Sequence, residues 1–266
     1  DGALTDDGRT PLDPDTPAAG RRRSCLRPEE VEARIEAQAE LLLDGRSWAA
    51  LATMRMHRWE RMDLTVPFAV RQELRDECLK ASAKALTVDE GNVAAWMQLG
   101  LCALQDGLYN KAQGYFLQVL GEQPRLVAGW CNLGMALQLG GETSDAERAY
   151  ARGLELCPEG AGLLNNLGNL HRQLGAWGKA EATYLRALAS SPRDPQVHNN
   201  LGLLYVHTGD LDRARDCFQR AADLSPGAPW ALANLDKVGR LQKRRASGMG
   251  DVPWASEPGP SHDPPP

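Results

Sequence analysis

Carboxamide side chains recur at a fixed interval through the middle of this 266-residue chain. Each lies 34 residues from the next, and the series is Gln98, Asn132, Asn166, Asn200 and Asn234. A side-chain amide offers one acceptor and two donors, so it can bond both the N–H and the C=O of a polypeptide of any sequence. Asparagine is a mediocre helix former, so its recurrence needs a reason. Two roles are open: the amides bind a peptide backbone, or they join neighbouring structural units.

The residue types that commonly perform catalysis or hold metals form no recognisable pattern. None of the six cysteines belongs to a C-x-x-C motif, and His198 and His207 lie nine residues apart on one predicted helix, too far to share a metal. The chain has no nucleophile–base signature, no P-loop and no dinucleotide-binding fingerprint. We therefore predict no catalytic residue, no metal ligand and no cofactor, in a protein that is not an enzyme.

Composition limits the partners and the compartment. The formal net charge of −5 argues against nucleic-acid binding by the chain as a whole. No stretch approaches the roughly 20 apolar residues that span a bilayer. Free cysteines within predicted helices indicate an intracellular, reducing compartment. The chain begins at Asp1 without methionine, which is compatible with removal of an N-terminal targeting peptide.

Four further series of residues share the 34-residue interval. They are glycines Gly100, Gly134, Gly168 and Gly202; alanines Ala112, Ala146, Ala180 and Ala214; aromatics Phe116, Tyr150, Tyr184 and Phe218; and prolines Pro124, Pro158, Pro192 and Pro226. Glycine inside a helix costs about 1 kcal/mol relative to alanine, so its repetition indicates close approach of a second helix. We expect the alanines to be the small partners of the glycines, the aromatics to fill the wider space beside them, and the prolines to end each second helix.

The glycines that separate the two helices of each unit have a different role. They are Gly107, Gly141, Gly175 and Gly209, and each follows the first helix of its unit. Glycine at such a position allows the positive φ that a tight turn requires. The pattern therefore predicts a series of helix pairs, each closed by a short turn.

The period and this order of small, aromatic and proline residues resemble the tetratricopeptide repeat. The resemblance implies an all-α solenoid of antiparallel helix pairs, with four repeats at 93–126, 127–160, 161–194 and 195–228. In this frame Trp96 and Trp130 occupy the fourth position, where the family has tryptophan. Leu164 and His198 depart from the family at that position.

The segment that follows the fourth repeat resembles one more first helix. Asp236 stands where the repeats have glycine, and no second helix follows. We predict a capping helix over 229–245, because the end of a solenoid needs a polar outer face. The termini, 1–24 and the proline-rich 246–266, are predicted to be disordered, because neither has an apolar face to bury.

The segment before the first clear repeat, 25–92, is predicted to hold divergent N-terminal helices that include a degenerate repeat. Cys78 occupies the small position of its second helix. Its first helix is expected from Ser47 to Met62, because Pro67 interrupts the span that the repeat would require. A further amphipathic helix is expected over 28–43.

The family resemblance also implies a binding surface. First helices of the family line a concave face, and the sixth position, where the amides stand, points into it. The ladder resembles the repeat superhelix of O-linked N-acetylglucosamine transferases, which grip extended peptides in this way. The neighbouring candidates for the groove are Met97, Leu101, Met135, Asn165, Asn169, Arg172, Asn199 and Leu203. The basic clamp of the chaperone adaptors in this family is absent, since Met97, Leu101 and Gly162 occupy its positions.

These observations favour a non-catalytic scaffold or adaptor that binds a peptide or protein segment in the concave groove. One alternative is a structural or assembly subunit of a larger complex, which uses its convex face and its tails while its own N-terminal helix fills the groove. A third is the substrate-binding fragment of a glycosyltransferase. The expected partner is protein in each case.

Overall fold

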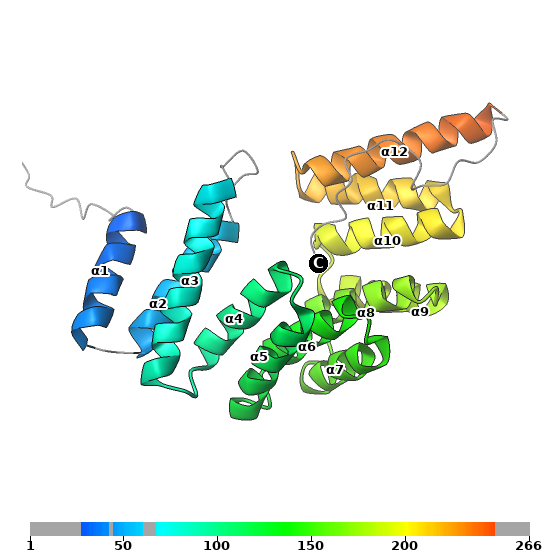
Figure 1. Cartoon of the computed structure of the whole chain (residues 1–266). Coiled ribbons are helices and arrows are strands. Elements are labelled where there is room, and N and C mark those ends of the chain that lie inside the picture. Colours follow the sequence, from blue (N-terminus) through cyan, green and yellow to red (C-terminus); the bar gives the residue numbers. More distant parts are fainter. Residues whose placement is uncertain (1–27, 43–44, 61–67, 248–266) are drawn as a thin grey trace, which may run out of the picture.

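The computed structural model describes residues 28–42, 45–60 and 68–247, and every regular element within them is an α-helix. The helices are α1 (Pro28–Leu42), α2 (Gly45–Glu60), α3 (Phe68–Val88), α4 (Val93–Gln105), α5 (Tyr109–Glu122), α6 (Val127–Leu139), α7 (Thr143–Leu156), α8 (Ala161–Gln173), α9 (Trp177–Ser190), α10 (Pro195–Thr208), α11 (Leu211–Leu224) and α12 (Pro229–Ala246). Each helix packs on its neighbours in sequence, and the helices form one curved stack from α1 to α12 (Figure 1). The predicted all-α solenoid is confirmed.

The turns within the pairs require glycine. Gly107, Gly141, Gly175 and Gly209 have φ angles of 69°, 87°, 71° and 81°. This left-handed region is costly for any residue with a Cβ atom. The turn between the two helices of each repeat is therefore set by one local residue, as the sequence indicates.

The repeated glycine lies directly against the aromatic ring of the second helix. A Cβ atom at Gly100 would lie 2.4 Å from Cε1 of Phe116, and one at Gly168 would lie 2.5 Å from Cε1 of Tyr184. A helical side chain leans toward the N-terminus, so an aromatic four residues after the alanine covers the surface beside the alanine and reaches the glycine. The alanines are small because they lie beneath this packing, and all four are fully buried.

The side chain at the fourth position joins the first helix to the loop before it in three of the four repeats. Nε1 of Trp96 donates to the carbonyl oxygen of Glu90, and Nε1 of Trp130 donates to that of Pro124, both at 2.8 Å. Nε2 of His198 lies 3.0 Å from the carbonyl oxygen of Pro192 and donates to it in the tautomer protonated there. The departure from tryptophan at His198 therefore preserves the contact, whereas Leu164 at the same position has no donor.

Ion pairs as well as apolar contacts hold the N-terminal helices α1, α2 and α3 together. Helices α2 and α3 pack together as a pair, and Sγ of Cys78, buried in α3, donates to the carbonyl oxygen of Ala52 at 3.3 Å. Three glutamates four residues apart on α1 pair with α2 and α3: Glu32 with Arg58 at 3.6 Å, Glu36 with Arg55 at 2.9 Å, and Glu40 with Lys84 at 3.6 Å. Residues four apart share a helix face, so one side of α1 is its docking side.

The expected disorder of 1–24 concerns residues outside the described part of the chain. So does that of 246–266, except for Ala246, which ends α12, and Ser247, which follows it. None of the helices that the structure describes is long and apolar enough to cross a membrane.

Candidate interaction surface on the first helices

Helices α4, α6, α8, α10 and α12 carry the amide series, and successive members from α4 to α10 contact one another directly. The sixth position of each first helix thus faces the fifth position of the first helix before it. The amides can therefore form hydrogen bonds with the side chains at that fifth position.

Each amide of the series donates to the preceding unit. Nδ2 of Asn132 donates to Sδ of Met97 at 3.1 Å, and Nδ2 of Asn166 donates to Sγ of Cys131 at 3.3 Å. Further along, Asn200 donates to Oδ1 of Asn165 at 2.9 Å, and Asn234 donates to Oδ1 of Asn199 at 2.8 Å. Nε2 of Gln98 donates to Oγ1 of Thr53 on α2 at 3.3 Å. One N–H of every amide in the series therefore joins two neighbouring units.

The acceptors divide the series into two halves. Asn132 and Asn166 donate to sulfur, which is a weak acceptor, whereas Asn200 and Asn234 donate to amide oxygens. Asn132 and Asn166 are also half-buried, whereas Asn200 is only 5% exposed. Asn132 and Asn166 can therefore change partners at small cost, whereas Asn200 is a fixed part of the packing, and Asn234 is half-buried but bonded to a buried amide oxygen.

Burial divides the candidates along a different line, because Gln98 at the start of the series is buried and Asn234 at its end is half-buried. Those that keep part of their surface are Met97, Leu101, Asn132, Met135, Asn166, Asn169, Arg172 and Asn234. Those that are buried are Gln98, Asn165, Asn199, Asn200 and Leu203. The sequence-based expectation that all of these side chains line an open groove is therefore revised, because Gln98 on α4, Asn165 on α8, and the α10 residues Asn199, Asn200 and Leu203 are covered by neighbouring helices.

One of the half-buried polar candidates, Asn169, already accepts a hydrogen bond from a tyrosine. The hydroxyl of Tyr184 donates to Oδ1 of Asn169 at 2.6 Å. Burial raises the pKa of Tyr184 to about 12, although the positive charge of Arg172 opposes the shift. The hydroxyl is therefore protonated at neutral pH and holds Asn169 in place. The hydroxyl of Tyr150 has the same role toward Oε1 of Gln138 at 3.0 Å.

A second set of contacts links α7 to α8 and α9 to α10. Nε2 of His171 lies 3.5 Å from Oε1 of Glu147, and the hydroxyl of Tyr205 donates to Oε1 of Glu181 at 2.7 Å. His171 occupies the position that Tyr205 fills one repeat later, and at 8% exposed it is a packing residue. The glutamates were not predicted, although their spacing of 34 residues is visible in the sequence.

The thiols of Cys131 and Cys217 are not activated. Burial raises the pKa of Cys131, and burial with the nearby Asp216 carboxylate raises that of Cys217 to about 11. Both are therefore protonated at neutral pH, and a protonated thiol is a poor nucleophile. No group of three or more metal-ligating side chains occurs in the part of the chain that the structure describes.

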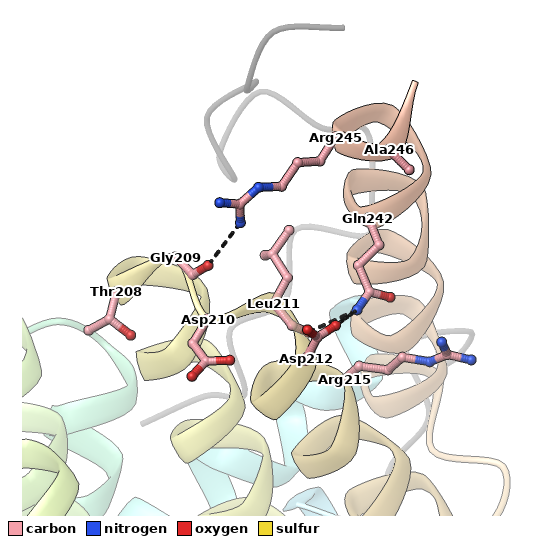
Figure 2. A pocket seen from close by; sticks show the side chains of 9 residues that line it. All are labelled: Thr208, Gly209, Asp210, Leu211, Asp212, Arg215, Gln242, Arg245 and Ala246. Atoms are coloured by element: carbon pink, nitrogen blue, oxygen red, sulfur yellow. Dashed lines mark hydrogen bonds between the residues drawn. The ribbon is translucent and has the colours of Figure 1, made fainter. Parts of the chain in front are cut away.

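A hollow of 790 Å³ lies at the far end of the stack, between the turn that joins α10 to α11 and the last turns of α12 (Figure 2). Its walls carry Asp212 and Arg215 from α11, and Gln242 and Arg245 from α12. Nε2 of Gln242 donates to Oδ1 of Asp212 at 2.7 Å, and Nη1 of Arg245 donates to the carbonyl oxygen of Gly209 at 3.3 Å. The lining is mainly polar, and no sequence motif indicates it.

Comparison with known proteins agrees with the architecture. Two overlapping segments, residues 131–195 and 165–229, match the sequence model of a tetratricopeptide repeat family. The chain has no match among curated protein sequences.

Three solved structures are similar in fold. TTC0263, a tetratricopeptide repeat protein of Thermus thermophilus, has a TM-score of 0.58 and 23% identity over 65% of this chain and 94% of its own. A tetratricopeptide repeat protein of Parabacteroides merdae has a TM-score of 0.65 and 17% identity over 84% of this chain and 87% of its own. The Cut9–Hcn1 hetero-tetramer of APC/C gives a TM-score of 0.63 and 19% identity over 79% of this chain and 39% of the matched chain. At these identities the likeness concerns the fold.

Proposed function

We propose that the chain is a scaffold or adaptor that holds a segment of a partner protein along its first helices. Its repeats are of the tetratricopeptide type, and this fold generally forms protein–protein interaction modules. Proteins of this fold are typically non-catalytic. The finer part of the proposal, that the partner binds as an extended peptide on α4, α6 and α8, rests on Asn132 and Asn166.

These two amides keep unused hydrogen-bonding capacity at a half-exposed surface. Each donates one N–H to sulfur, and within the described residues neither makes another hydrogen bond. The oxygen and the second N–H of each amide can therefore accept from one peptide N–H and donate to one peptide C=O. An extended peptide that crosses α6 and α8 would meet both amides without any requirement on its side chains.

The surroundings of the two amides define the chemistry of the segment. Met97, Leu101 and Met135 are half-buried beside Asn132 in the predicted groove, and the methionine side chains are flexible and polarizable. Such a surface adapts to apolar side chains of different shapes. We therefore expect the segment to carry apolar residues over α4 and α6.

Affinity capture with matched variants tests this function. Wild-type chain should retain a partner that the Asn132→Ala/Asn166→Ala double variant loses, while an Asn200→Ala variant retains it. Capture of the same partners by all three proteins would contradict the role of the groove.

The second hypothesis, an assembly subunit that uses its convex face, is supported by two exposed leucines. Leu117 on α5 and Leu185 on α9 occupy the same position of their second helices and are 56% and 50% exposed. If this surface carries the function, Leu117→Ser/Leu185→Ser would abolish the capture and the asparagine variants would not. The third hypothesis, a fragment of a glycosyltransferase, has no supporting observation among the described residues.

A further inference from the structure

The contacts between second helices and following first helices change at the end of the array. Glu147 faces His171, and Glu181 faces Tyr205, with 24 residues between the members of each pair. The corresponding residues one repeat later are Arg215 on α11 and Gly239 on α12. The position of the two glutamates thus holds an arginine, and the position of His171 and Tyr205 holds a glycine. We call the space beside this glycine, between α11 and α12, the slot.

The slot at Gly239 is open. A Cβ atom placed on Gly239 would meet no heavy atom within 4 Å. A hollow of 400 Å³ lies there, lined by Arg215, Gly239, Gln242 and Lys243 among others. Arg215 and Gln242 also line the neighbouring hollow of 790 Å³ (Figure 2), so the two spaces share one wall.

The charged residues that line the smaller hollow are both basic. Within the described residues, the side chains of Arg215 and Lys243 have no hydrogen bond or ion pair, and Arg245 bonds only the carbonyl oxygen of Gly209. The carboxylates of Asp210 and Asp212 line only the larger hollow, where Asp210 pairs with Arg213 at 3.1 Å and Asp212 accepts from Gln242 at 2.7 Å, and no carboxylate lines the smaller one. The slot therefore presents two positive charges, from Arg215 and Lys243, beside the apolar surface of Leu235.

We propose that the slot between α11 and α12 binds a carboxylate side chain of an acidic segment in a partner protein. The guanidinium of Arg215 would hold the carboxylate in its planar fork, and Lys243 would add a second positive charge. The occupant is a protein side chain because the two preceding slots of the array hold protein side chains, His171 and Tyr205. The site goes beyond the proposed function, because it lies apart from Asn132 and Asn166 on α6 and α8.

Fluorescence polarization with a labelled hexaglutamate peptide tests the site, with hexaglutamine as the uncharged probe. The measurement is made on the full chain at low salt, where exposed charges are least screened. Hexaglutamate should bind and hexaglutamine should not. Arg215→Gln should weaken binding by about tenfold, because it removes a charge-assisted bond.

Substitutions at Gly239 separate the slot from general surface charge. Gly239→Tyr restores the side chain that Tyr205 supplies in the preceding repeat, so it should block hexaglutamate while the melting temperature is kept or raised. Gly239→Ala leaves most of the slot open and should bind as wild type does. Arg152→Gln, which removes an exposed arginine from α7, is the matched charge control and should also bind normally.

Several results would overturn the proposal. Binding that survives Arg215→Gln and Gly239→Tyr in folded protein would place the peptide elsewhere, and equal loss with Arg152→Gln would indicate general surface charge. Equal affinity for an oligothymidylate strand would indicate an unselective anion site. Much tighter binding after Asp251→Asn/Glu257→Gln/Asp263→Asn would identify the chain's own C-terminal segment as the occupant. None of these results depends on Asn132 or Asn166, so the groove hypothesis is tested separately.

Discussion

Asn200 donates from its side-chain amide to Oδ1 of Asn165, which lies 35 residues earlier, and the two side chains are 5% and 9% exposed. The equivalent bond one repeat earlier, from Asn166, ends on the sulfur of Cys131 at 3.3 Å. Asn200 and Asn166 occupy the same repeat position, but Asn200 bonds a buried amide oxygen whereas Asn166 bonds only a sulfur atom. This difference separates the amides that stabilise the solenoid from those that can serve a ligand.

The buried amide bond should contribute to stability. Asn200→Ala leaves Oδ1 of Asn165 without its donor, and an unpaired buried polar group costs about 1–3 kcal/mol. Asn166→Ala releases only a sulfur atom, so its cost should be below about 1 kcal/mol. Urea unfolding of the two variants measures both values, and equal destabilisation would contradict the division of the series.

The glycine–aromatic contact should be intolerant of a single methyl group. Gly168→Ala places a Cβ atom 2.5 Å from the ring of Tyr184, which is fully buried and held through its hydroxyl by Asn169. Overpacking of this kind costs about 1–3 kcal/mol. Gly114→Ala on α5 is the control, because its Cβ meets nothing within 4 Å, and it should stabilise by about 0.5–1 kcal/mol. Thermal unfolding of both variants gives the comparison, and a neutral Gly168→Ala would show that the ring can move.

Tyr184 should make stability depend on pH in the alkaline range. Its pKa is raised by burial to about 12, above the value of about 10 of an unfolded tyrosine. A group whose folded pKa is raised contributes stability that is complete below the unfolded pKa and is lost as pH rises toward the folded pKa. The difference in unfolding free energy between wild type and Tyr184→Phe should therefore be constant below about pH 10 and shrink between about pH 10 and 12. A difference that grows over this interval would contradict the assignment.

Arg55 on α2 should stabilise the packing of α1 and α3 against α2. Its buried guanidinium lies 2.9 Å from Glu36 and 3.3 Å from Glu77, whereas both carboxylates are more than one-third exposed. Because solvent screens the carboxylates, the expected cost of Arg55→Met is about 1–2 kcal/mol, below that of a fully buried pair. Arg148→Met, at an exposed ion pair with Asp145, should cost nearly nothing. Denaturant unfolding followed by circular dichroism measures both, and similar values would remove the special role of Arg55.

The sequence predicts those features that a single repeat determines locally. The turn glycines such as Gly107 need only their own φ angle, and the helix pairs follow from the period. The contact between Gly168 and Tyr184 depends on the direction in which a side chain leans, so the spacing alone does not identify it. The turns and the helix pairs are thus predictable from sequence, whereas the contacts between helices are less so.

Exposure of the amides could not be read from the sixth position alone. It depends on the fifth position of the preceding repeat, which runs Met97, Cys131, Asn165 and Asn199, and on how closely the first helices approach. The change from sulfur to amide in this series is visible in the sequence, but its meaning requires the offset of 35 residues that the structure provides. The slot at Gly239 is likewise evident only after Glu147 and Glu181 are seen to face the next first helix.

The most direct test of the groove is a calorimetric titration of the captured partner against wild type and Asn132→Ala/Asn166→Ala. Loss of two neutral hydrogen bonds per residue, at about 0.5–1.5 kcal/mol each, predicts affinity weaker by about 30-fold or more, with the melting temperature nearly unchanged. The matched Asn200→Ala/Asn234→Ala variant should lower the melting temperature and keep wild-type affinity while it is folded. Unchanged affinity of the Asn132→Ala/Asn166→Ala variant would contradict peptide recognition by these amides.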